Sequence, residues 1–199
     1  MKTDLGRMFG FAYGEKENGA VFSHMAVMYA NALYRRGFAR KGYKALQTLA
    51  DTAMVFETSK IYPGIPEYFN AKGRGMYHYL TGAASWYMLT IVTEVFGVRG
   101  KAGDLEIVPA LMKEQIDDDG KAEITLPFAG KKFHIIIENP QKSEYEDYRI
   151  RSAAIDGRNI PLAEMPQGSG RTMVKAVIGK AEIETLSEGV HKIEILLEA

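Results

Sequence analysis

The sequence has no cysteine, no net charge and no long apolar run, and each absence excludes a class of protein. Without cysteine the chain has no disulfide, no thiolate metal site and no cysteine nucleophile. Its 25 basic and 25 acidic side chains cancel, so no overall field favours nucleic acid or an anionic membrane as partner. Any charged ligand must therefore be bound by local groups. The first residues lack the apolar core of a signal peptide, and no stretch approaches the roughly eighteen apolar residues of a membrane span, which predicts a cytoplasmic protein.

The first half of the chain has helical periodicity. Two amphipathic helices are expected over residues 22–33 and 43–54, joined near Gly37 into an antiparallel hairpin, with Met25 and Tyr29 on the apolar face and Ser23 as cap of the first. Residues 1–20 and 57–76 are rich in glycine, charge or proline, and are predicted to form loops. Residues 73–96 lead from a glycine-rich loop into a helix that is apolar almost all round. In a soluble protein such a helix has to be enclosed by other elements.

After Gly97 and Gly100 the spacing of apolar residues changes from about 3.6 to 2, which indicates strands. Turn signals such as Asp156-Gly157 separate these strands, so we expect a small β-sandwich. His134 and His191 are predicted at exposed strand positions. The fold class is α+β multidomain, with a helical segment over residues 1–100 and a β-sandwich domain over residues 101–199.

Three segments follow one another in a specific order. Residues 16–24 read KENGAVFSH, residues 79–86 read YLTGAASW, and residues 94–99 read EVFGVR. Together they resemble the C-terminal portion of glycoside hydrolase family 94, whose members are inverting phosphorylases of β-glucosides such as cellobiose, cellodextrins and 1,2-β-oligoglucans. The resemblance implies that the helical segment is the last part of an (α/α)6 barrel and that an antiparallel β-sandwich follows it.

The resemblance also implies a reaction. The chain would be the C-terminal fragment of an enzyme that cleaves β-glucans or cellobiose-like disaccharides with inorganic phosphate, giving α-glucose 1-phosphate. The family's catalytic acid, an Asp, lies in a portion outside these residues, so no catalytic residue is assigned here and the chain alone is expected to be inactive. No metal and no cofactor are expected besides phosphate as co-substrate.

Phosphate binding is expected where two helices begin. Inverting hydrolases activate water with a carboxylate, but phosphate is already an anion and needs a cradle of donors instead. The resemblance assigns that role to His24, Gly82 and Ala83. An imidazole N–H at a helix start adds to the free backbone N–H groups and the helix dipole. The family has Thr or Ser at the position of Ala83, and its absence removes one donor, a loss of about 1.5–3 kcal/mol. The alternative for His24 is a residue that only caps or packs.

Sugar binding is expected from the two loops, because saccharides are held by aromatic faces and polar groups in concave sites. The candidates are Glu17, Asn18, Glu67, Arg74 and Tyr77, with Tyr62, Tyr68, Phe69, Asn70, His78 and Tyr79 nearby. The alternative is that the tyrosines cover the last helix and the charged residues face water.

Two further functions stay open. A non-catalytic carbohydrate-binding or interaction module could be built from the same parts, and so could a structural remnant without a ligand. If the helices that enclose residues 87–96 are missing, exposed apolar surface should be covered by self-association into a homo-oligomer.

Overall fold

A computed structural model describes residues 3–61, 64–77, 82–166 and 170–199 of the chain. The chain forms two compact units, the first of Met1–Leu33 and Lys41–Thr90, the second of Tyr34–Arg40 and Ile91–Ala199. Helices and mostly antiparallel strands together confirm the α+β class. None of the helices in these ranges has the length and apolar content that crossing a bilayer requires.

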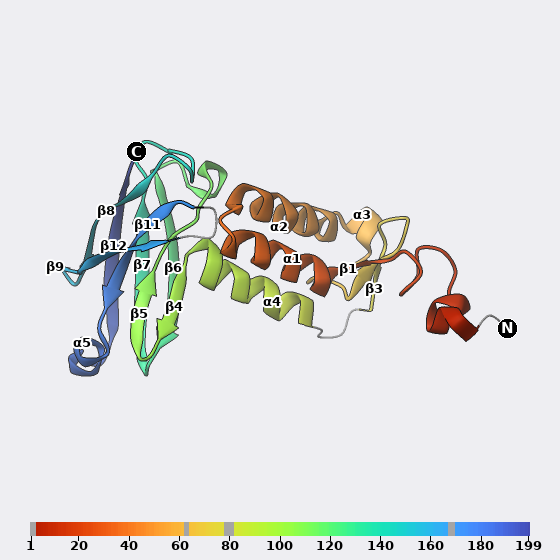
Figure 1. Ribbon diagram of the computed structural model, residues 1–199, viewed down its shortest axis with the longest axis horizontal. Coiled ribbons are helices and arrows are strands. Elements are labelled where there is room, and N and C mark those ends of the chain that lie inside the picture. Colours follow the sequence, from red (N-terminus) through yellow and green to blue (C-terminus); the bar gives the residue numbers. More distant parts are fainter. Residues whose placement is uncertain (1–2, 62–63, 78–81, 167–169) are drawn as a thin grey trace. The chain divides into compact units, whose positions relative to one another are not determined.

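The first unit consists of short helices and a small sheet (Figure 1). Its elements in chain order are η1 (Thr3–Gly10), β1 (Val21–Phe22), α1 (Ser23–Arg35), α2 (Ala39–Met54), α3 (Phe56–Ser59), β2 (Tyr68–Phe69), β3 (Gly75–Met76) and α4 (Gly82–Thr90). The strands form an antiparallel sheet in the order β1-β2-β3. The two helices expected over residues 22–33 and 43–54 are thus confirmed as α1 and α2.

Polar contacts tie α4 to both of these helices. The side-chain amide of Asn31 in α1 donates to Oγ1 of Thr90 in α4 at 3.2 Å, and both residues are buried. The hydroxyl of Tyr87 in α4 donates to the carbonyl of Leu46 in α2 at 3.5 Å. These bonds hold the C-terminal half of α4 against α1 and α2, and the other end of α4 is the candidate phosphate site.

Two expectations for α1 are wrong. The helix buries Val27 and Ala30, while Met25 and Tyr29 are exposed. Oγ of Ser23 is buried without a hydrogen-bond partner in the described residues, so it does not cap the helix. The first error arises because α1 carries apolar residues on two faces and only its neighbours decide which face is covered.

The helix that was expected to be enclosed is only partly covered. Within α4, Ala83 and Thr90 are buried, but Met88 and Leu89 are exposed. The chain continues as one π-helical turn, η2 (Ile91–Val95), which belongs to the second unit. Exposed methionine, leucine and tyrosine side chains therefore occur on both α1 and α4 of the first unit.

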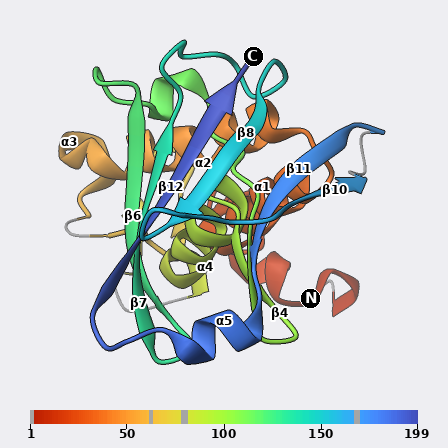
Figure 2. The same cartoon turned by 90° about the vertical axis from the view of Figure 1, so that its left-hand side faces the viewer.

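The second unit contains two sheets (Figure 2). Its further elements are β4 (Val98–Lys101), β5 (Asp104–Ile107), η3 (Lys113–Gln115), β6 (Lys121–Phe128), β7 (Lys131–Glu138), β8 (Arg149–Ile155), β9 (Arg158–Asn159), β10 (Leu162–Pro166), β11 (Thr172–Ile178), α5 (Lys180–Thr185) and β12 (Val190–Glu198). One sheet has the order β10-β11-β5-β4 and the other the order β6-β7-β12-β8-β9.

One strand pair corrects the expectation of purely antiparallel sheets. β12 lies parallel to β7, in register from Val190 opposite Lys132 to Leu196 opposite Glu138. The other pairs are antiparallel. A parallel pair needs a long crossover, and here the segment from β8 to α5 separates the two strands.

The core of the second unit is made of inward-facing side chains of both sheets. Fully buried examples are Leu105, Ile107, Phe133, Ile135, Ile137, Ile155, Ile178, Ile193 and Ile195. Tyr148 is buried among them, and its hydroxyl accepts from the Leu111 amide at 2.8 Å and donates to the Leu111 carbonyl at 3.1 Å. Burial raises the pKa of Tyr148 well above its ordinary value, so the hydroxyl keeps its proton.

His191 is buried, which contradicts its predicted exposure. Its Nδ1 lies 2.7 Å from Oδ2 of Asp156 and its Nε2 lies 3.0 Å from the Ser187 carbonyl oxygen. Both partners are acceptors, so this arrangement favours the protonated ring, in which both nitrogens donate. The hydrogen bond to Asp156 raises the pKa of His191.

Candidate functional site

The imidazole of His24 lies directly against the first residue of α4. A Cβ built on Gly82 would come within 2.6 Å of Cε1 and 2.8 Å of Nδ1 of His24. The His24 ring also lies 5.9 Å from the ring of Trp86, one turn further along α4. Positions 24 and 82 therefore meet this closely because Gly82 has no side chain.

Two polar atoms at the start of α1 have no hydrogen-bond partner among the described residues. They are Nε2 of His24 and Oγ of Ser23, and both are buried. Buried polar groups almost always have partners, and leaving one without costs about 1–3 kcal/mol. Both atoms lie in the first turn of a helix of 13 residues, where the dipole favours negative charge. An oxyanion that accepts from His24 and Ser23 would satisfy both groups at once.

The remaining residues predicted at this site are at the start of α4. Ala83 is fully buried and offers only a methyl group in place of the hydroxyl of the family. Ser85 does not replace that donor, because its Oγ is exposed and donates to the Gly82 carbonyl at 3.2 Å. His78, Tyr79 and Tyr62, which were expected beside the ligand, lie outside the described residues.

A second group of charged and aromatic side chains joins the N-terminal loop to the β1-β2-β3 sheet. Nζ of Lys16 lies 3.2 Å from Oε2 of Glu67, 3.7 Å from the ring centroid of Tyr77 and 5.4 Å from that of Tyr68. The hydroxyl of Tyr68 donates to Oε2 of Glu15 at 2.9 Å. Burial, together with this bond, raises the pKa of Tyr68 to about 12. We call these five residues the loop cluster.

The backbone of the loop cluster is strained at two points. Lys16 and Tyr77 have φ values of 44° and 63°, a region that residues other than glycine rarely adopt. Such strain costs about 1–3 kcal/mol per residue and persists only where the surroundings impose it. Although burial opposes the shift, the hydrogen bonds of Lys16 to Glu67 and Tyr77 raise its pKa, so the lysine stays charged.

The structure thus brings together two of the predicted sugar-binding residues, Glu67 and Tyr77. Tyr68, which was expected near the sugar, completes the loop cluster together with Lys16 and Glu15, which were not assigned a role from the sequence. Lys16 had one available signal, since it opens the first of the three family-like segments. The contact itself joins residues 51 positions apart, which no local pattern reveals.

Glu17 and Asn18 have different surroundings. The side-chain amide of Asn18 donates to the Phe11 carbonyl at 2.8 Å, so it holds the loop together. Glu17 lies 3.5 Å from an exposed Arg7 and, with Lys16 and Met25, lines an open hollow of about 390 Å³. Glu17 is therefore the residue of this pair that is available to a ligand.

Arg74 lies in the connection between β2 and β3. Its backbone N–H donates to Oδ1 of Asn70 at 3.1 Å, and its carbonyl accepts from the Asn70 amide at 3.0 Å. The residue is exposed, and the structure does not bring it to the loop cluster. Within the described residues, no group of three or more His, Asp or Glu side chains is arranged to hold a metal ion.

Comparison with known proteins relates the chain to disaccharide phosphorylases. No family model matches it. It is 26% identical over 181 residues to N,N'-diacetylchitobiose phosphorylase of Vibrio proteolyticus, an alignment that covers 86% of this chain and 22% of that protein. It is also 26% identical over 157 residues to cellobionic acid phosphorylase of Neurospora crassa, covering 72% and 19% respectively. The chain spans about a fifth of the length of these curated relatives, and the relationship is phosphorylase-like.

Proposed function

We propose that this chain is the C-terminal part of an inverting phosphorylase of the glycoside hydrolase family 94 type. The complete enzyme would cleave a β-linked glucoside or related disaccharide with inorganic phosphate and release α-glucose 1-phosphate. The names of both relatives support a disaccharide substrate. The three family-like segments support the family, and the first two of them meet in the first unit at His24 and Gly82.

The observation that carries this proposal is the buried, partnerless Nε2 of His24 beside Gly82. In the proposed mechanism His24 and the free backbone N–H groups at the start of α1 hold phosphate on one face of the sugar. The phosphate oxygen attacks the anomeric carbon while an acid outside these residues protonates the leaving oxygen. Donors aimed at an anion in a covered site are stronger than in water, because little reorganisation is needed.

The loop cluster would bind the sugar next to this phosphate. Tyr77 offers an aromatic face and Glu67 a carboxylate, while Glu17 in the neighbouring hollow adds a second acceptor. Asn18 would act indirectly by fixing the loop, and Arg74 would contribute only from its exposed hairpin. We assign no metal and no cofactor besides phosphate.

The remaining architectural proposal concerns the helices. The exposed residues Met25 and Tyr29 of α1 and Met88 of α4 are what inner helices of an (α/α)6 barrel would present to neighbouring helices. The two sheets of the second unit would form the accompanying β-sandwich. In the isolated chain we expect the same apolar side chains to promote self-association.

The test uses the histidine resonances of the 199-residue chain. Inorganic phosphate should shift the imidazole signals of His24 saturably and leave those of His134, an exposed histidine paired with Glu123, unchanged. The indole signal of Trp86, whose ring lies 5.9 Å from that of His24, should shift with phosphate as well; His24→Gln should abolish this Trp86 shift and His134→Gln should keep it. If phosphate leaves His24 unaffected in the folded chain, the assignment of the phosphate subsite is wrong.

The same chain distinguishes the enzyme fragment from a binding module. We expect no release of sugar 1-phosphate from β-glucans or disaccharides by the chain alone. Glucan binding that is independent of phosphate and survives His24→Gln would instead favour a non-catalytic carbohydrate-binding module.

A further inference from the structure

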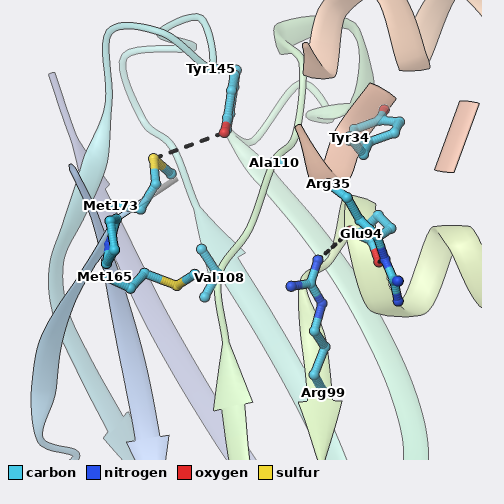
Figure 3. Close-up of a pocket in the computed structure, with 10 residues that line it drawn as sticks. Tyr34, Arg35, Glu94, Arg99, Val108, Ala110, Tyr145, Met165 and Met173 are labelled. Atoms are coloured by element: carbon cyan, nitrogen blue, oxygen red, sulfur yellow. Dashed lines mark hydrogen bonds and ion pairs between the residues drawn. The ribbon is translucent and has the colours of Figure 1, made fainter. Parts of the chain in front are cut away.

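A small cavity in the second unit contains a buried carboxylate between two arginines (Figure 3). Glu94 lies in the π-helical turn η2, and its side chain is 0% exposed. Arg35, the last residue of α1, places Nε 3.1 Å from Oε1 of Glu94, and Arg99 of β4 bonds the other oxygen through Nη2. One acid thus binds two guanidinium groups, one at each of its carboxylate oxygens. Single π-helical turns of this kind are frequent at functional sites.

The two arginines keep unused donors. Nε of Arg99 donates to the Thr93 carbonyl at 2.7 Å, and its Nη2 is used by Glu94. Within the described part of the chain, Nη1 of Arg99 and both Nη atoms of Arg35 have no partner. Their side chains are 37% and 65% exposed, so a ligand can reach them. A carboxylate or phosphate oxygen is the acceptor that a guanidinium fork fits best.

The charges around the cavity favour an anion. Glu94 neutralises only one of its two arginines. Glu106 lies opposite Arg99 in the β4–β5 ladder, but its carboxylate is already 2.5 Å from Nζ of Lys175 and 4.0 Å from Nζ of Lys101. Among the described residues that line the cavity, two cations therefore stand against one carboxylate, which leaves a local excess of one positive charge in a chain with none overall.

The walls and the size of the cavity restrict the ligand. Opposite the arginines it is lined by Val108, Ala110, Met165 and Met173, whose apolar surfaces lower the local dielectric and strengthen the attraction of an anion. Its volume of about 90 Å³ accommodates a few water molecules or one small oxyanion. Sites for drug-sized ligands span about 300–1,000 Å³, so a disaccharide does not fit.

The geometry points to a second anion site in this protein, in which Arg35 and Arg99, held by Glu94, bind a small oxyanion separately from the His24 region. A tetrahedral anion can offer a separate pair of oxygens to each of two guanidinium groups, which a carboxylate with two oxygens cannot. The ligand is therefore of the phosphate or sulfate type. The inference does not depend on the proposed phosphorylase function.

The experiment uses the methionine methyl groups that line the cavity. In the 199-residue chain with labelled methionine methyls, phosphate should shift the signals of Met165 and Met173 saturably, and sulfate should do the same. Acetate should bind more weakly, and chloride at equal ionic strength should have no saturable effect. Arg35→Gln should weaken phosphate binding by at least about tenfold, while Arg35→Lys should retain part of it.

Two control variants test whether phosphate binds in the arginine cavity rather than in the His24 region or through surface charge. His24→Gln should leave the methyl shifts unchanged, and Arg151→Gln should do so as well, since Arg151 pairs with Glu198 at the same 3.1 Å at an exposed position of the same unit. If phosphate produces no saturable shift at Met165 and Met173, or if folded Arg35→Gln and Arg35→Lys bind it as the parent does, the site does not exist. Loss of the Met165 and Met173 shifts in folded His24→Gln would show a single site, which also overturns the inference.

Discussion

Replacing Glu94 by Gln tests whether the buried carboxylate organises the arginine cavity. Its oxygens accept from Arg35, Arg99 and the hydroxyl of Thr93, which lies 3.2 Å away. Gln keeps the shape and one acceptor, but its NH₂ group faces a guanidinium and one charge-assisted bond is lost, at about 1.5–3 kcal/mol. Breaking a fully buried ion pair costs about 3–5 kcal/mol, and the partial exposure of both arginines lowers that figure. We expect a loss of about 2–3 kcal/mol.

The measurement is urea and thermal unfolding of the second unit. For a unit of this size a loss of 2–3 kcal/mol corresponds to a fall in Tm of roughly 8–12 °C. Trp86, the single tryptophan, belongs to the first unit, so far-UV circular dichroism is the better probe. The matched control is Glu198→Gln, because its bond to Arg151 has the same 3.1 Å length as the bond between Arg35 and Glu94.

The Glu94–Arg35 and Glu198–Arg151 pairs differ in burial, and the comparison tests how burial changes the contribution of an ion pair to stability. Glu198 and Arg151 are 48% and 60% exposed, and such surface pairs contribute about 0–1 kcal/mol. Glu198→Gln should therefore lower the stability by less than about 0.5 kcal/mol. If Glu94→Gln costs no more than Glu198→Gln, burial does not strengthen the Glu94 interaction and the reasoning on the cavity fails.

Three further predictions concern other contacts. The bond to Asp156 raises the pKa of His191 above 6.5, so this pair should contribute about 1.5–3 kcal/mol below pH 6.5 and lose its effect as the pH rises through the raised pKa. Urea midpoints measured against pH should show this slope in the parent, and an equal slope in His191→Gln would contradict it. Gly82→Ala should displace the imidazole of His24 and lower the free energy of unfolding by about 1–3 kcal/mol. The urea midpoint should fall and the ¹⁵N shift of His24 should change. An unchanged spectrum would refute the contact. Tyr148→Phe should cost about 1–3 kcal/mol in urea unfolding because it leaves a buried backbone N–H unbonded, and a neutral result would argue against that bond.

The positions of helices and strands could be predicted because they depend on local spacing. The 3.6-residue period before Gly97 and the two-residue period after it correspond to α1, α2 and the strands from β4 onward. The strand direction could not be predicted in this way. Alternation gives the face of β12 but not its partner, so the parallel pairing with β7 was missed.

The burial of His191 could have been predicted from the sequence. His191 and Ile193 are two residues apart, so their side chains lie on the same face of β12, and Ile193 is fully buried. Exposure was predicted because His191 was placed on the face opposite Ile193, although the two residues share a face. The carboxylate of Asp156, in the turn after β8, supplies the acceptor that the buried imidazole needs, and that partner is 35 residues away in the chain.

Only part of the candidate site was predicted from the sequence. Glu67 and Tyr77 were chosen for their chemistry in a long connection, and they do meet in the loop cluster. Lys16 was not chosen, although it contacts both. Which of several charged loop residues is buried against an aromatic ring depends on the folded path of residues 1–20, for which composition gives only the expectation of a loop.

The distribution of charge explains how a chain with no net charge can contain two different kinds of cationic site. In the loop cluster Lys16 is matched by Glu67, so its charge is used within the fold and the cluster as a whole has little attraction for anions. Around Glu94 two arginines share one acid, and the second positive charge remains available. Anion binding therefore depends on the local ratio of cations to buried carboxylates. By that criterion the arginine cavity should bind oxyanions through charge, whereas the His24 region must rely on its unpaired donors and the dipole of α1.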